Sequence, residues 1–250
     1  MTDQSTAIWL RGERAPRGRA PEHTRGEIAA AAVRLADRQG LAAVTMRALA
    51  RVIGTGAASL YRYVATRDEL VELMVDEVNG EFELERRPDA SWLDQMVDLA
   101  HQARDIYRRH PWMIEALDTT PTLGPHGCSY LEHALATLAV TGAGGRTRLE
   151  AIGVFSGLVR LLCKAERDRQ QPGPPSARMA QRNAYLSSVA ASGEHPHLAA
   201  AFAETSEQSS SEGPQYQGIP AAPSDGQFDG QFDRIVRRTL LGMLHEGDPD

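Results

Sequence analysis

Two short helical patterns meet at Gly54-Thr55-Gly56, and this junction restricts the fold more than any other stretch of the chain. Before it, four apolar residues recur at the spacing of one helix face: Met46, Leu49, Ala50 and Ile53. Thr45, just before them, is expected to cap the N-terminus of this helix. After it, three residues can be buried on a second helix: Ala57, Leu60 and Val64. Two glycines in three residues favour a tight turn. Two short helices joined in this way are the sequence form of a helix-turn-helix.

Helix-start signals flank this pair on both sides. Thr24-Arg25-Gly26-Glu27 and Thr66-Arg67-Asp68-Glu69 both fit the capping box, in which a threonine and a glutamate satisfy free amides reciprocally. The first box precedes a stripe that ends at Gly40, formed by Ile28, Ala32, Leu35 and Ala36. The second precedes the stripe of a fourth helix, formed by Leu70, Leu73, Met74 and Val78. The sequence therefore predicts three short helices and then a longer one.

The remainder keeps helical periodicity, and no stretch shows the alternation of a strand, so we expect an all-α fold. Helices are predicted near 91–109, 111–117, 126–141, 146–170 and 174–191. A last helix has a sharp apolar stripe, formed by Phe232, Ile235, Val236, Thr239, Leu240, Met243 and Leu244. We expect a flexible basic arm over 1–21, a helix-turn-helix domain over 22–66, and a helical ligand-binding and dimerisation bundle over 67–250, with a mobile loop at 204–227.

Charge is divided unevenly along the chain. The net charge is −6, yet the residues through Arg67 hold eleven arginines and five acids, or +6, which leaves −12 for the remainder. A basic end favours a polyanionic partner. Neither a membrane-spanning run nor a signal peptide is present, so we expect a cytoplasmic protein without a membrane partner. Cys128, Cys163 and His195-Pro196-His197 lack metal-ligand arrangements, and we expect no metal and no cofactor.

The start of the second short helix is suited to DNA. A recognition helix can approach the base edges of the major groove only if the side chains at its start are small. The residues at this start, Ala57, Ala58 and Ser59, are small. The hydroxyls of Tyr61 and Tyr63 can donate to phosphate oxygens, and Arg62 can reach a guanine edge or a phosphate. The alternative is an ordinary helical hairpin with solvated arginines.

These residues also carry a resemblance. The run TMRALARVIGTGAASLYRYVATRDEL resembles the DNA-binding domain of the TetR family of bacterial repressors, above all in its LYxYxxxRDEL pattern. Weaker motifs, His110-Pro111-Trp112, LGPHGCSYLEHAL and FDRIVRRTLLGM, resemble the tetracycline-repressor-like C-terminal domain. The resemblance implies a homodimer on a palindromic operator, released by a small-molecule effector. It also implies that the last helix and 146–170 pair across the dimer.

Carried over by position, the resemblance implies the operator contacts Thr45, Arg47, Ala58, Ser59, Tyr61, Arg62, Tyr63 and Arg67. The chain departs from the family at Thr55-Gly56-Ala57, where a hydrophobic residue and then a polar one are more usual. This departure alters how the recognition helix is positioned on the rest of the domain, so the base preference of the family is not carried over to this chain. Arg14, Arg17 and Arg19 of the arm either track the DNA or only keep the chain soluble.

The aromatic and methionine residues of the C-terminal half are candidates for the effector pocket or for ordinary core. They are Tyr107, Trp112, Met113, Tyr130, His133 and Phe155. The function predicted is a repressor that leaves its operator when the effector binds; the alternative is a ligand-independent DNA-binding regulator whose C-terminal domain only dimerises. The chain holds none of the GxSxG, HExxH, Walker A or Rossmann motifs, and we do not expect an enzyme.

Overall fold

The computed structural model describes residues 8–10, 23–119, 123–170, 177–201 and 225–245. All regular structure within these ranges is helical, as the sequence predicts. The chain divides into two compact units, the first formed by Met1–Lys164 and Ile235–Asp250 and the second by Ala165–Arg234. No helix in the described ranges is both long enough and apolar enough to cross a membrane.

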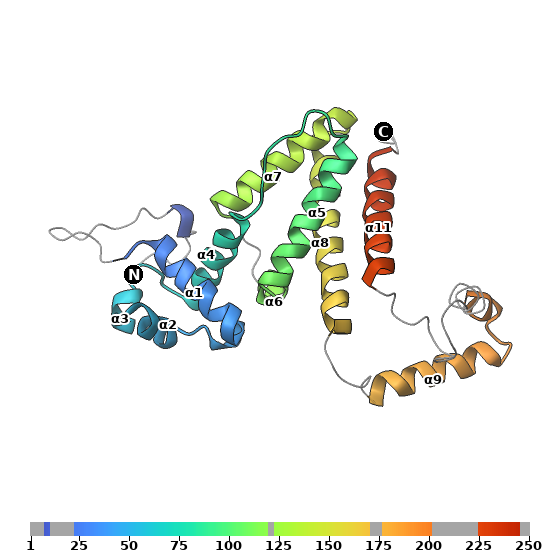
Figure 1. The fold of residues 1–250 in the computed structure, drawn as a ribbon, viewed down its shortest axis with the longest axis horizontal. Helices are drawn as coiled ribbons and strands as arrows, with labels where there is room; N and C mark the ends of the chain where they lie inside the picture. Colours follow the sequence, from blue (N-terminus) through green and yellow to red (C-terminus); the bar gives the residue numbers. More distant parts are fainter. Residues whose placement is uncertain (1–7, 11–22, 120–122, 171–176, 202–224, 246–250) are drawn as a thin grey trace. The chain divides into compact units, whose positions relative to one another are not determined.

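The helix-turn-helix begins with α1, Arg25–Gln39, followed by α2, Met46–Ile53, and α3, Ala57–Leu60 (Figure 1). The predicted capping box is confirmed, because the Thr24 hydroxyl accepts from the Glu27 amide and the Glu27 carboxylate accepts from the Thr24 amide. The Thr45 hydroxyl caps α2 by accepting from the Ala48 amide at 3.1 Å. Gly54 ends α2 with φ of +73°, a conformation that favours glycine and turns the chain into α3.

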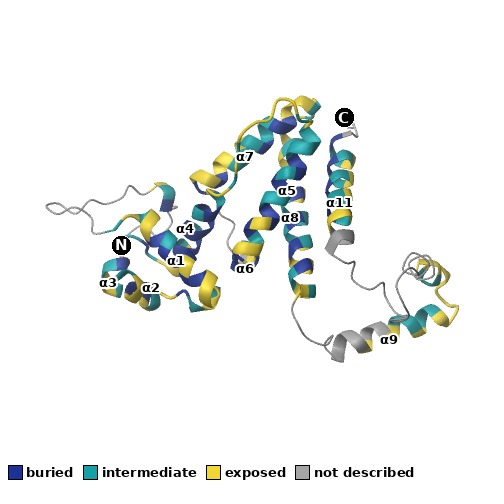
Figure 2. Cartoon of the chain, in the orientation of Figure 1, coloured by how far each residue is buried: buried dark blue, intermediate teal, exposed yellow. Residues whose placement is uncertain are grey.

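Helix α4, Arg67–Asn79, shares one hydrophobic core with α1, α2 and α3. Leu70, Met74 and Val75 are fully buried in this core. Figure 2 shows α4 largely in the colour of buried residues. The second capping box differs from the prediction in one bond. Thr66 accepts from the Glu69 amide as expected, but the Glu69 carboxylate accepts from the amide of Ala65, one residue before the cap. The bond still satisfies a free amide at the start of the helix.

The predicted helices of the C-terminal part are confirmed with small changes at their ends. They are α5, Trp92–Arg109; α6, Trp112–Thr119; α7, Pro125–Leu138; α8, Gly145–Gln170; α9, Ala177–Ala191; and α11, Asp225–His245. A 3-10 turn, Ala139–Thr141, continues α7, and a short helix covers 196–201. The predicted stripe of the last helix is also seen, since Phe232, Val236, Leu240 and Leu244 are buried.

The N-terminal region departs from a simple arm. Ile8–Leu10 form a 3-10 turn, and Ile8 is buried in the same core as α1 and α4. Trp9 packs against this core as well. Ile8 and Trp9 therefore attach part of the predicted basic arm to the hydrophobic core. The other arm residues, 1–7 and 11–21, lie outside the described residues, as do positions 204–224 of the predicted loop, and 225–227 already belong to α11.

Candidate nucleic-acid interface

The segment predicted to read DNA is exposed on one side and anchored on the other. Leu49 of α2 and Leu60 of α3 are fully buried, and Val64 is buried at the end of the segment. Ala58 and Arg62 are exposed, and Tyr61 is 54% exposed. The apolar spacing thus turns the small and polar side chains outward, as the sequence predicts.

The recognition segment is a shorter helix than the sequence predicts. Its regular part ends at Leu60, and residues 61–63 form turns. Helix-like bonds nevertheless continue, because the amides of Tyr63 and Val64 both donate to the Leu60 carbonyl, at 2.9 and 3.0 Å. Tyr61, Arg62 and Tyr63 are therefore carried on a tight continuation of α3.

Six of the eight predicted DNA contacts are exposed: Thr45, Arg47, Ala58, Tyr61, Arg62 and Arg67. Ser59 is half-buried, and Tyr63 is half-buried against the core. The Thr45 hydroxyl oxygen caps α2, which leaves its hydrogen as a donor for a phosphate oxygen. Most of the predicted set is therefore exposed on α2, on α3 and on the turns that follow α3, which together are called the α2 and α3 edge.

The eighth predicted contact, Arg67, has backbone partners within the protein. Its Nε donates to the Val44 carbonyl at 3.2 Å, and its Nη2 donates to the Leu41 carbonyl at 3.0 Å. Both acceptors lie just before Thr45, the cap of α2. Arg25, the first residue of α1, is used in a similar way on the carbonyls of Tyr63 and Ile8. Neither role can be read from the sequence, because the acceptors are main-chain atoms far away in sequence.

A polar cluster joins α1 to the corner between α5 and α6. One oxygen of Asp37 accepts from the indole nitrogen of Trp112 and lies 2.7 Å from Nδ1 of His110. The other ring nitrogen of His110 lies 3.0 Å from a Glu81 oxygen, and Glu81 also pairs with Arg109. Burial alone raises the pKa of Glu81, but Arg109 and His110 together hold that pKa below its ordinary value. Each side chain of this cluster thus has a charged or hydrogen-bonding partner.

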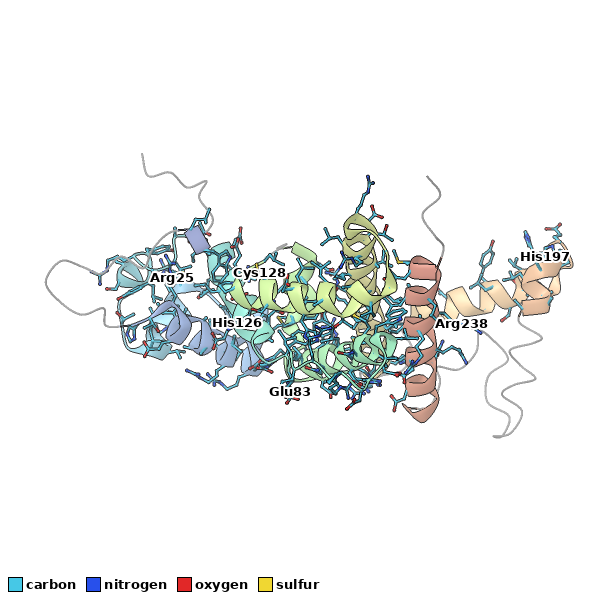
Figure 3. All side chains as sticks on the ribbon, turned by 90° about the horizontal axis from the view of Figure 1, so that it is seen from above. Arg25, Glu83, His126, Cys128, His197 and Arg238 are labelled. Atoms are coloured by element: carbon cyan, nitrogen blue, oxygen red, sulfur yellow. The ribbon has the colours of Figure 1, made fainter. Side chains whose placement is uncertain are left out.

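A second polar joint connects α4 to the start of α7. Asp76 is 4% exposed, and its carboxylate accepts from the amides of His126 and Gly127. The ring of His126, which Figure 3 labels, also bonds to the Asp76 carbonyl at 3.0 Å. These bonds satisfy free amides at a helix N-terminus, where a negative charge is favoured. Nothing in the sequence pattern of α4 distinguishes this acidic residue from a solvated one.

The six predicted pocket residues are not all brought together. Trp112 and Met113 belong to the core shared with the helix-turn-helix. His133 lies near Leu84 and Arg86, and burial lowers the pKa of its ring. Phe155 is buried on α8. Tyr107 and Tyr130 are close enough to influence one another, and burial raises the pKa of each phenol.

The two tyrosines mark the interior where α5, α7 and α8 meet. The Tyr130 hydroxyl bonds to Ser156, and its ring packs against Phe82 with the centroids 4.8 Å apart. Cys163 and Arg160 of α8 lie near Tyr107. Arg160 in turn pairs with Asp118 of α6 at 3.0 Å. This interior therefore combines aromatic surface with a few polar groups, the composition typical of a small-molecule site.

Comparisons with known proteins agree with this arrangement. The family of bacterial regulatory proteins named tetR matches residues 28–74, and the tetracyclin repressor-like C-terminal domain matches residues 85–214. The chain is 31% identical over 207 residues to the HTH-type transcriptional repressor DrrR1 of Streptomyces coeruleorubidus. The aligned region covers 79% of this chain and 76% of DrrR1. It is 34% identical over 174 residues to an HTH-type transcriptional regulator of Saccharopolyspora erythraea, which covers 68% of this chain and 73% of that protein.

A solved structure is similar over nearly its whole length. It is the Streptomyces coelicolor TetR family protein ActR in complex with actinorhodin, with 28% identity and a TM-score of 0.67. The match covers 88% of this chain and 98% of that one.

Proposed function

Because the chain belongs to the TetR family, it is a DNA-binding transcription regulator rather than an enzyme, and we propose that it is a repressor. Binding of a small molecule would release this repressor from its operator. The exposed edge of α2 and α3, fixed from behind by buried Leu49 and Leu60, is the observation that carries this proposal. The proposed operator contacts are Thr45, Arg47, Ala58, Ser59, Tyr61, Arg62 and Tyr63. Acting on chromosomal DNA, the protein works in the cytoplasm.

The effector site that we propose lies where α5, α7 and α8 meet. Tyr107, Tyr130 and Phe155 supply aromatic surface there, and Ser156 and Arg160 supply polar groups. ActR was solved with actinorhodin, so actinorhodin is the first compound to test. An effector that binds better to the form with misaligned recognition helices weakens DNA binding by the same factor, typically about 5- to 150-fold.

The proposed operator is palindromic, because two copies of the chain would present two recognition segments about 34–36 Å apart. Support for the homodimer comes from α8, on which three large apolar side chains are exposed: Leu149, Val154 and Leu161. Val154 and Leu161 are about two helical turns apart and share one face of α8, and exposed apolar residues on one face are typical of a protein interface. Pairing through α8 and α11 would cover them.

Footprinting on the DNA that flanks its own gene tests the repressor. We expect protection of a palindromic site, and loss of this protection when the effector is added. Arg62→Ala should weaken binding by about 5- to 150-fold, the range for one base contact, or lower the salt slope by about 0.9 if Arg62 contacts a phosphate. Normal binding and a normal slope in this variant, at an unchanged oligomeric state, would contradict the assignment.

Leu161→Arg tests the dimer. Leu161 is 63% exposed in the single chain, so a charge there is tolerated by the fold but would be buried in the proposed interface. Light scattering after size exclusion should show a monomer, with the helical content unchanged. Leu123→Arg, at another exposed leucine outside α8, is the matched control and should leave the dimer intact. A dimeric Leu161→Arg variant would place the interface elsewhere.

A further inference from the structure

Two arginines that begin helices reach from behind to the main chain at opposite ends of the DNA-reading unit, here Thr45–Val64. Arg67 is the first residue of α4, and Arg25 is the first residue of α1. Each uses its Nε and one terminal nitrogen on two carbonyls, and each carbonyl belongs to a segment far away in sequence. The same device therefore occurs twice.

Arg67 fixes the beginning of the unit. Its acceptors, the carbonyls of Leu41 and Val44, belong to the turn that leads into Thr45. Val44 is fully buried, so its main chain is already tied to the core. The guanidinium thus links α4 to the residue pair that sets where α2 starts and where the Thr45 hydroxyl points.

Arg25 fixes the end of the unit. Its Nε donates to the Tyr63 carbonyl at 3.4 Å, at the point where helical bonding stops and free carbonyls remain. Its Nη1 donates to the Ile8 carbonyl at 3.0 Å. Because Ile8 is buried in the core, this second bond ties the arginine to a buried neighbour. Figure 3 labels Arg25 at the start of α1.

We propose that Arg25 and Arg67 are positioning residues for DNA reading: their guanidinium groups hold the two ends of the Thr45–Val64 unit through main-chain carbonyls rather than neutralising operator phosphates. This inference rests on the proposed use of the α2 and α3 edge on DNA. A planar guanidinium can donate from Nε and a terminal nitrogen to two acceptors at once. Lysine keeps the charge but cannot reproduce this fork, so Arg→Lys substitutions separate the two roles.

The test measures binding of the full-length protein to a duplex that the wild type selects from a random-sequence library, and to an unselected duplex, over a range of salt. Arg67→Lys and Arg25→Lys should each bind the selected duplex about tenfold more weakly, within the range for loss of one base contact. Binding to the unselected duplex and the salt slope should stay unchanged, because the number of positive charges is the same. A phosphate contact predicts the opposite, namely near-normal binding by the lysine variants.

Amide hydrogen exchange of the free protein gives a second readout that needs no DNA. Arg67→Lys should speed exchange at the Ala48 amide, and Arg25→Lys should speed it at the amides of Tyr63 and Val64. Arg51→Lys, the same change at an exposed residue of α2, is the control and should change neither region.

Unchanged exchange in both positioning variants, or wild-type affinity for the selected duplex, would overturn the inference. Failure of the wild type to select any duplex would instead contradict the proposed function, and the exchange result would still decide the roles of Arg25 and Arg67.

Discussion

Asp37→Ala is expected to lower the free energy of unfolding by about 2–4 kcal/mol, because one carboxylate oxygen serves two buried donors. Trp112 is 3% exposed, and the His110 ring is nearly as buried. Removing their shared acceptor leaves an indole N–H and an imidazole nitrogen without that partner, away from most water. Chemical denaturation monitored by circular dichroism measures the loss.

Two further variants make this result specific. Asp37→Asn keeps one oxygen acceptor but removes the charge and replaces the other carboxylate oxygen with an NH2 donor, so its cost should be smaller, about 1 kcal/mol. Asp105→Ala removes an exposed carboxylate that pairs with Arg108 on the same helix, and it should change stability by less than about 0.5 kcal/mol. Equal losses from Asp37→Ala and Asp105→Ala would show that the cluster adds nothing beyond a surface ion pair.

Gly124→Ala is expected to destabilise the protein by about 1–3 kcal/mol through overpacking. An added Cβ would overlap the carboxylate of Asp76 and the ring edge of Trp9. Asp76 cannot swing aside cheaply, since it is buried and accepts from two amides of α7. The change should therefore loosen the joint between α4 and α7, which thermal unfolding measures.

Gly26→Ala is the matched control for this substitution. Gly26 lies in the first turn of α1, where an added Cβ has ordinary space beside Thr24. Alanine favours helix over glycine by up to about 1 kcal/mol, so this variant should be equally stable or more stable. A Gly124→Ala variant as stable as Gly26→Ala would mean that the α4 and α7 joint yields freely.

The parts of the fold that depend on neighbouring residues could be read from the sequence. The threonine caps, the apolar stripes and the glycine turn each act within one helical turn, so spacing alone places them. The one capping bond that differed, from Ala65 to Glu69, departed by a single residue. Local physics therefore gave the helices and the outward face of α3.

The contacts between elements could not be read in this way. Arg67 near a helix start predicts a phosphate contact as readily as a bond to Leu41 and Val44, since both use the same donors. Trp112 and Met113 have the periodicity of buried residues, but periodicity does not say that they pack into the core of the helix-turn-helix. Such partners depend on how helices cross, and a single stripe does not fix a crossing.

The shared position of α4 bears on how regulators of this kind can be recombined. Leu70, Met74 and Val75 complete the interior of the DNA-binding part, while Asp76 on the same helix holds the beginning of α7. A chimera joined at residue 66 would separate the transplanted helix-turn-helix from α4, which supplies part of its hydrophobic core. A graft that exchanges operator preference should instead include the chain through Asn79. The recipient α7 must then have first-turn amides that can donate to the Asp76 carboxylate, and a glycine before it that leaves room for this carboxylate.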